Sequence, residues 1–241
     1  MTDNYAWVRR VIFPLTAIDN AAMAFLKLQN SNSPRLLGSI MFIRAPPSAP
    51  IPREPIISLT AVYYGPVSDA EQSAADLFNP ELLRHSSAAN TSTVSLHKMN
   101  DGTEFLNKVG GYKQLGNALL CHISLDSIRQ GAKAWSRSGD EHQDAKERTI
   151  IFCGNWSTAS AQRNMLLPGT DRKGFLQVLV WYMEDNTTEP AKEFMEDMLR
   201  IGRRRDNENG SAPVTFPNNQ LLGGRINEVY SENRSSGDPT G

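Results

Sequence analysis

Apolar positions recur along this chain with two periods, one typical of strands and one typical of helices. The clearest strand runs from Ile56 to Tyr64, where β-branched and aromatic residues dominate before a Gly65-Pro66 turn. The clearest helix runs from Pro190 to Arg205, with apolar residues at helical spacing on one side. The same patterns predict further strands at Ala6–Phe13, Leu36–Arg44, Val94–Met99, Tyr112–Ile123, Arg148–Trp156 and Phe175–Glu184. They predict further helices at Thr16–Gln29, Val67–Arg84 (bent near Pro80), Asp101–Val109 and Leu125–Ser138.

Helical segments separate several of these strands, which predicts an α+β fold. We expect a six- or seven-stranded, mainly antiparallel sheet with helices covering one face. Residues 1–213 would form this domain, and the polar segment 214–241 would be partly disordered. Ser86–Ser92 is small and polar and is predicted to be a loop. Ser157–Lys173 is a longer predicted loop and hence a candidate for function.

Composition narrows the classes of function. The 241 residues have a formal net charge of −1, so no overall field favours nucleic acid or an anionic membrane. The first residues lack the basic and apolar regions of a signal peptide, and no apolar run is long enough to span a membrane. We therefore expect a cytoplasmic protein, with Cys121 and Cys153 as free thiols.

The common site motifs are absent from the sequence. It contains no phosphate-binding glycine loop, no nucleophile elbow and no zinc-protease motif. The four histidines show no ligand spacing, so no metal site is expected. Cys121 and His122 are neighbours on a predicted strand, which would point them to opposite faces and keep them from forming a dyad.

The order of short segments nevertheless resembles a known family. Val62-Tyr63-Tyr64-Gly65 followed by Ser68-Asp69-Ala70-Glu71 is similar to the opening of the substrate domain of flavin-dependent oxidases. These are oxidases of the berberine bridge enzyme and p-cresol methylhydroxylase type, with fungal natural-product oxidases as the nearest in character. Gly110-Gly111-Tyr112-Lys113 resembles a later part of the same domain, and Val229-Tyr230-Ser231-Glu232-Asn233 is similar to the family's closing helix, so the resemblance spans roughly residues 8–233.

The chain departs from the family pattern at two points, and both change the expected function. The family's FAD-binding domain precedes this domain and is not found in the chain, and segment 214–241 would be a remnant of its C-terminal part. The region matching the family's catalytic base, Asn155–Thr170, contains no Asp or Glu. The chain alone is therefore expected to hold no cofactor and to oxidise nothing by itself. Asn218, in a Phe-x-Asn segment resembling the family's Tyr-x-Asn, would contact FAD only if flavin were supplied.

In the family, substrate lies on the open face of the sheet, beneath the flavin. Strand alternation here yields faces that mix polar and aromatic side chains, which suits a pocket floor. His122 is the candidate catalytic residue, because an imidazole titrates near neutral pH and can exchange protons. The candidate substrate-binding residues are Tyr64, Gln114, Trp156, Gln177 and Trp181. Each also has a simpler interpretation as a surface or packing residue.

Three functions remain open on this reading. The first is a truncated FAD-linked oxidoreductase-like protein acting on a small natural-product intermediate, with a separate flavin domain as partner. The second is a flavin-independent cyclase or isomerase, which needs mainly shape and a few hydrogen bonds. The third is a non-catalytic binding or dimerisation module. All three expect the exposed face to be covered, most simply by homo-oligomerisation.

Overall fold

The computed structural model describes residues 4–31, 33–99, 101, 108–155, 172 and 174–215. Its centre is a seven-stranded sheet in the order β4-β1-β3-β2-β6-β7-β5, in which every neighbouring pair is antiparallel. The strands are β1 (Tyr5–Pro14), β2 (Leu36–Arg44), β3 (Pro55–Tyr63), β4 (Ala88–Ser95), β5 (Tyr112–Leu120), β6 (Ile150–Asn155) and β7 (Gly174–Tyr182). The predicted α+β class, with a mainly antiparallel sheet, is confirmed.

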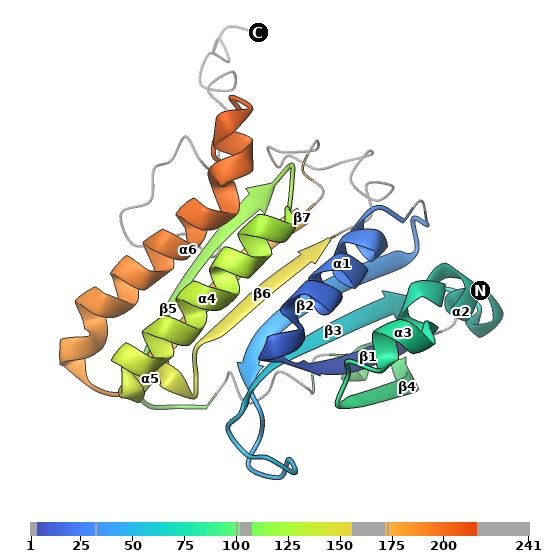
Figure 1. The fold of residues 1–241 in the computed structure, drawn as a ribbon, viewed down its shortest axis with the longest axis horizontal. Coiled ribbons are helices and arrows are strands. Elements are labelled where there is room, and N and C mark those ends of the chain that lie inside the picture. Colours follow the sequence, from blue (N-terminus) through green and yellow to red (C-terminus); the bar gives the residue numbers. More distant parts are fainter. Residues whose placement is uncertain are drawn as a thin grey trace, which may run out of the picture.

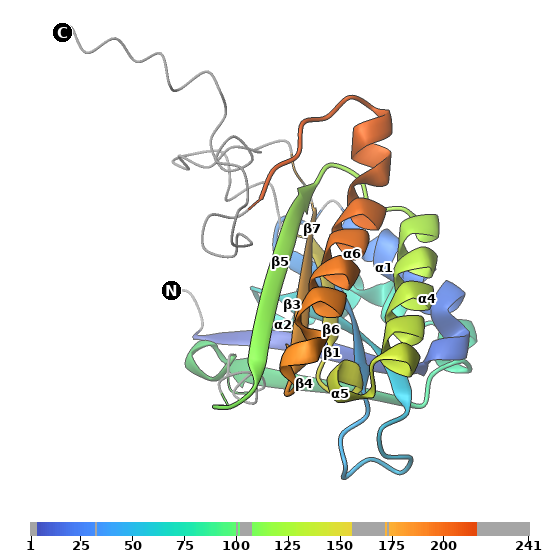
Figure 2. The same ribbon diagram turned by 90° about the vertical axis from the view of Figure 1, so that its left-hand side faces the viewer.

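Helices cover one face of the sheet. The long ones are α1 (Ile18–Gln29), α4 (Leu125–Glu141) and α6 (Thr188–Glu208), and all three lie on the same side (Figures 1 and 2). The short ones are α2 (Val67–Ser73), α3 (Pro80–Leu83) and α5 (Gln143–Lys146). The bend expected at Pro80 is a helix start, because Pro80 occupies the first turn and the Asn79 side chain accepts a hydrogen bond from the Glu81 N–H.

The core lies between the sheet and these helices. Strand side chains such as Phe13, Leu59 and Ile151 are buried there against helix residues such as Phe25 and Met195. The opposite face of the sheet carries the alternate strand residues, which are largely half-buried. Among the described residues, no helix combines the length and apolar character that a membrane crossing requires.

The order of elements repeats within the sheet. The series β1-α1-β2-β3 is followed by β5-α4-β6-β7, and each series places its third strand between its first and its second. Within the sheet, the two units meet where β2 pairs with β6, over four residue pairs from Ser39↔Gly154 to Phe42↔Ile151, and on the helix side α1 packs against α4. This repeat was not visible in the sequence.

One strand lies where a loop was predicted. Ala88–Ser95 forms the edge strand β4, and the predicted strand Val94–Met99 contributes only its first two residues before a 3-10 turn at Leu96–Lys98. Six of the eight residues of β4 are exposed. Ordinary strand propensity is weak for such small polar residues, so the strand is formed by pairing with β1 from Tyr5↔Ser95 to Ile12↔Ala88.

Candidate functional site

The sheet face opposite the helices carries a mixed row of polar and apolar side chains. Cross-strand pairing places Ser58, Met41, Phe152, Gln177 and Asn117 next to one another on β3, β2, β6, β7 and β5. Directly paired residues share a face of the sheet, so this row crosses five strands on the side away from α4 and α6. Of the predicted substrate residues, this row contains Gln177.

An aromatic pair borders this row. The rings of Phe152 and Phe175 are 5.2 Å apart at an angle of 35°. Their approach depends on Gly154, because a Cβ atom at that position would lie 2.8 Å from the Phe175 ring. A side chain at position 154 would therefore push Phe175 away from the face.

The polar end of the row is held by the segment that follows α6. Thr215 donates its hydroxyl to Asn117 Oδ1 at 2.7 Å, and Val214 pairs with Leu119 at the outer edge of β5. Asn117 is buried, whereas its neighbour Gln177 is half-buried. Gln177 is thus the amide of this row that is open to a ligand.

The predicted substrate residues do not all lie together. Gln177 lies in the row. Gln114 points to the helix side, where its amide donates to the Tyr182 hydroxyl at 2.9 Å and to the Thr188 carbonyl at 3.2 Å. Tyr64 follows β3 and is 42 % exposed. Trp156 and Asn218 lie outside the described residues.

Trp181 is on the same face as Gln177 but is enclosed. Its side chain is buried, and its indole N–H donates to the Gly110 carbonyl at 3.0 Å. The Lys113 ammonium lies 4.2 Å from the ring centroid and the Arg148 guanidinium 5.6 Å from it. These cation–π contacts occupy the indole, so it supports the end of the floor rather than offering a free stacking surface.

A cavity among the described residues lies on the other side of the sheet. It has a volume of about 30 Å³ and is lined by apolar side chains of β2, α4 and α6, together with the Cys153 thiol. That space fits one or two water molecules but offers them few polar partners. Burial raises the pKa of Cys153 to about 12, so this thiol stays protonated at neutral pH.

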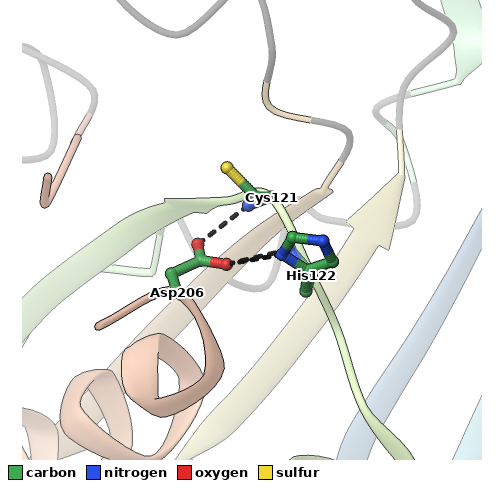
Figure 3. Close-up of side chains that lie close together, drawn as sticks. All are labelled: Cys121, His122 and Asp206. Atoms are coloured by element: carbon green, nitrogen blue, oxygen red, sulfur yellow. Dashed lines mark hydrogen bonds and ion pairs between the residues drawn. The ribbon is translucent and has the colours of Figure 1, made fainter. Parts of the chain in front are cut away.

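A second cluster joins the end of β5 to the end of α6. The Asp206 carboxylate on α6 accepts hydrogen bonds from the backbone N–H of Cys121 at 2.8 Å and of His122 at 3.0 Å. Its Oδ1 also lies 3.2 Å from His122 Nδ1 (Figure 3), and its Oδ2 lies 3.0 Å from the Arg172 guanidinium. The Asp206 and Arg172 side chains are 4 % and 5 % exposed, whereas that of His122 is 56 % exposed.

This geometry orients the predicted catalytic histidine. The buried Asp206 carboxylate contacts Nδ1 and so orients the imidazole, while most of the side chain is exposed to solvent. His122 lies beyond the end of β5, on the edge toward α6, and not in the row that contains Gln177. The structure therefore does not bring the predicted catalytic residue to the predicted floor.

The sequence argument that separated Cys121 from His122 is wrong. β5 ends at Leu120, so strand alternation no longer applies to the next two residues. Donor atoms of Cys121, His122 and Asp206 all lie within 4.8 Å of one another. Sequence reasoning missed Asp206, which lies in a charged stretch and meets its partners from 84 and 85 residues away.

Comparisons with known proteins bear on the fold alone. No family model matches the chain, and no curated protein matches it. Solved structures do match. Berberine bridge enzyme from Eschscholzia californica has a TM-score of 0.57 at 9 % identity, covering 83 % of this chain and 41 % of that one. BBE-like 1 from Physcomitrella patens has a TM-score of 0.59 at 10 % identity, covering 96 % and 49 %.

A BBE-like protein of Arabidopsis thaliana is similar in the same way, with a TM-score of 0.61 at 11 % identity, covering 83 % of this chain and 43 % of its own. The fold is thus that of part of a berberine bridge enzyme-like chain, as the resemblance of short segments predicted. The chain spans less than half the length of these relatives.

Proposed function

We propose that this chain is the substrate-side layer of a FAD-linked oxidoreductase of the berberine bridge enzyme type. It would act on a small natural-product intermediate and would need a flavin-binding unit supplied by another polypeptide or segment. The observation that carries the proposal is the coverage: matches extend over 83–96 % of this chain but over only 41–49 % of the similar structures. The matched half here is a sheet with helices on one face only.

In this proposal the open sheet face is the floor of the substrate pocket. Gln177 provides a half-buried amide that can bond a ligand hydroxyl or carbonyl, and the Phe152 and Phe175 rings provide an apolar wall. Met41 and Ser58 continue the floor toward β3. Tyr64 and Trp156 remain predicted substrate residues, Trp181 supports the end of the floor, and a catalytic role for His122 stays a prediction.

The described residues do not fit FAD itself. Pyrophosphate is typically held by a glycine-rich loop that leads into a helix N-terminus. In the described ranges, α4 begins at Ser124, whose hydroxyl accepts from the Ser127 N–H, and α6 begins after a Thr-rich turn without glycine. We therefore assign no flavin contact to these residues. The role of Asn218 at a flavin edge stays a prediction.

The apolar residues of the open face, such as Met41, Phe152 and Phe175, are half-buried and can be covered further by a partner surface. We propose that the flavin-binding unit provides it, and that a second copy of this chain can take its place when that unit is absent. Size-exclusion chromatography with light scattering tests this. We expect a dimer of the chain alone, and a 1:1 complex in place of the dimer when the flavin-binding unit is added.

The proposal is tested first by absorption. We expect the purified chain to be colourless and to retain no stoichiometric FAD after gel filtration. Retention of one FAD per chain would contradict the proposal. Turnover of a polyene or quinone substrate without flavin or oxygen would instead favour the cyclase or isomerase alternative.

The pocket floor is tested with a matched pair of glutamine variants. Small phenols and aromatic alcohols, with reticuline among them, serve as probes in a binding titration. Gln177→Leu should weaken binding of the best probe about fivefold, because one ligand hydrogen bond contributes about 1 kcal/mol. Gln114→Leu, on the opposite side of the sheet, should leave binding unchanged. Equal losses in both variants would place the ligand elsewhere.

A further inference from the structure

The corner between β5 and α6 gathers three side chains of the types that hold zinc. Cys121 contributes a thiol, His122 an imidazole and Asp206 a carboxylate, and their donor atoms lie within 4.8 Å of one another (Figure 3). Zinc in proteins is bound by this mixture of sulfur, nitrogen and oxygen, usually with tetrahedral geometry. The geometry points to a site for Zn²⁺ or a similar divalent transition metal, held by Cys121, His122 and Asp206 with solvent as fourth ligand.

The separations agree with a tetrahedral ion. Zinc–nitrogen and zinc–oxygen bonds of about 2.1 Å place neighbouring N and O ligands about 3.4 Å apart. His122 Nδ1 and Asp206 Oδ1 are 3.2 Å apart. A zinc–sulfur bond of about 2.3 Å requires the thiol about 3.6 Å from each of these atoms. The present separations are at most 4.8 Å, so Cys121 Sγ needs to approach by at most about 1.2 Å, and rotation about its Cα–Cβ bond is the side-chain motion that can move it.

The carboxylate is already oriented as a metal ligand would need to be. Metal-bound carboxylates are usually held by outer hydrogen bonds that fix their direction. Asp206 Oδ2 receives Arg172 at 3.0 Å and the Cys121 N–H at 2.8 Å, which leaves Oδ1 as the oxygen that faces the imidazole. Oδ1 keeps the His122 N–H at 3.0 Å and has a second lone pair for the ion.

The site also has an entry path. The His122 side chain is 56 % exposed and Cys121 is half-buried, so an ion reaches the cluster from solvent without opening the core. Three protein ligands leave one position for water, which is the arrangement of open zinc sites. Binding replaces the proton on the Cys121 thiol, which passes to solvent, and the neutral His122 ring binds through Nδ1 with its single N–H on Nε2.

The charge balance sets the strength of the site. The thiolate and carboxylate offset the two charges of the ion, and the Arg172 guanidinium adds one positive charge at Oδ2. We therefore expect binding weaker than in an all-cysteine structural site. Arg172 acts as a positioning residue, and its replacement should change metal affinity by about 10–100-fold, as for other outer hydrogen-bond partners.

The chain offers matched controls for the test. Cys153 is the other free thiol and is buried on β6, on the helix side of the sheet. His97 is another exposed histidine, bonded to Ser95 at the far edge of the sheet. The test variants are Cys121→Ser and His122→Ala, and the controls are Cys153→Ala and His97→Ala. The first two residues are partly exposed, so these variants should fold, which circular dichroism verifies.

The experiment uses tag-free full-length protein titrated with Co²⁺ and then with Zn²⁺ as a competitor. We expect one Co²⁺ per chain, visible d–d absorption of a four-coordinate ion and a sulfur-to-cobalt charge-transfer band, all displaced by Zn²⁺. Cys121→Ser should abolish the charge-transfer band and His122→Ala should weaken binding at least about tenfold, while both controls behave as wild type. Absence of stoichiometric binding, or a charge-transfer band that survives in Cys121→Ser, would overturn the assignment.

Discussion

Replacing Arg172 with methionine would leave the Asp206 carboxylate buried without its cation. The two side chains are 5 % and 4 % exposed, and their atoms approach to 3.0 Å. Removing one partner of a buried ion pair typically costs about 3–5 kcal/mol. Asp206 keeps two backbone N–H bonds, so we expect the lower end, about 3 kcal/mol. For a chain of this length that loss lowers the melting temperature by about 6–12 °C.

Urea unfolding of a double-variant cycle measures the interaction itself. Arg172→Met, Asp206→Asn and the combined variant should be non-additive, because the double variant no longer buries an unpaired charge. The coupling should exceed about 1 kcal/mol. Arg129→Met serves as control, since Arg129 contacts Asp19 at 2.6 Å on the surface with both side chains about half-exposed. Additive effects, or a loss in the control as large as in Arg172→Met, would refute the reasoning.

Two further predictions concern pH. Burial tends to raise the pKa of Asp144, but hydrogen bonds from the backbone N–H groups of Glu184 and Met183 outweigh it and hold this pKa below the ordinary 3.8. The ionised carboxylate therefore stabilises the fold above pH 3.8, and this stabilisation is lost as the pH falls through the folded-state pKa. In Asp144→Asn, urea titrations should show a free energy of unfolding about 1 kcal/mol lower at pH 7 and a smaller decrease of that free energy below pH 4. The same decrease below pH 4 as in the wild type would contradict this. Burial raises the pKa of Cys153 from 9.0 to about 12, so unfolding releases a proton and stability falls as pH rises above 9. At pH 8, a disulfide reagent should modify one thiol per native chain quickly and the second only after denaturation, and Cys121→Ser should remove the fast phase; two fast thiols in the native chain would contradict the burial of Cys153.

The elements that could be predicted are those whose pattern is strong locally. Ile56–Tyr64 coincides with β3 to within a residue, because its β-branched content favours a strand in any context. The helix expected at Leu125–Ser138 is α4, with Ser124 accepting from Ser127 N–H as its cap. Helices on one face follow from the alternation of strands and amphipathic helices.

The features that could not be predicted from the sequence depend on partners that are distant along the chain. Ala88–Ser95 lacks strand propensity, and only β1 makes it a strand. Gln114 and Gln177 looked equivalent by alternation, but the register pairs Gln114 with Val180 on the helix side and Gln177 with Asn117 on the open side. No local pattern encodes that register, because it is set when β5 and β7 meet.

The cluster of Cys121, His122, Arg172 and Asp206 could not be predicted from the sequence for the same reason. Its members come from just after β5, from two residues before β7 and from the end of α6, and none belongs to a recognisable motif. A lone aspartate after three arginines looks like a solvated charge until the fold buries it.

The pairing of β2 with β6, which joins the two repeated units within the sheet, should set the order in which the chain folds. Within each unit, paired residues are at most 70 positions apart along the chain (Tyr112↔Tyr182), whereas Ser39 and Gly154 are 115 positions apart. Long loops are slower to close and cost more entropy than short ones. Each unit should therefore gain structure early, and their docking along β2 and β6 should be the last, rate-limiting event. A cleavage between Ser95 and Tyr112 would then yield two pieces able to recombine into the native sheet.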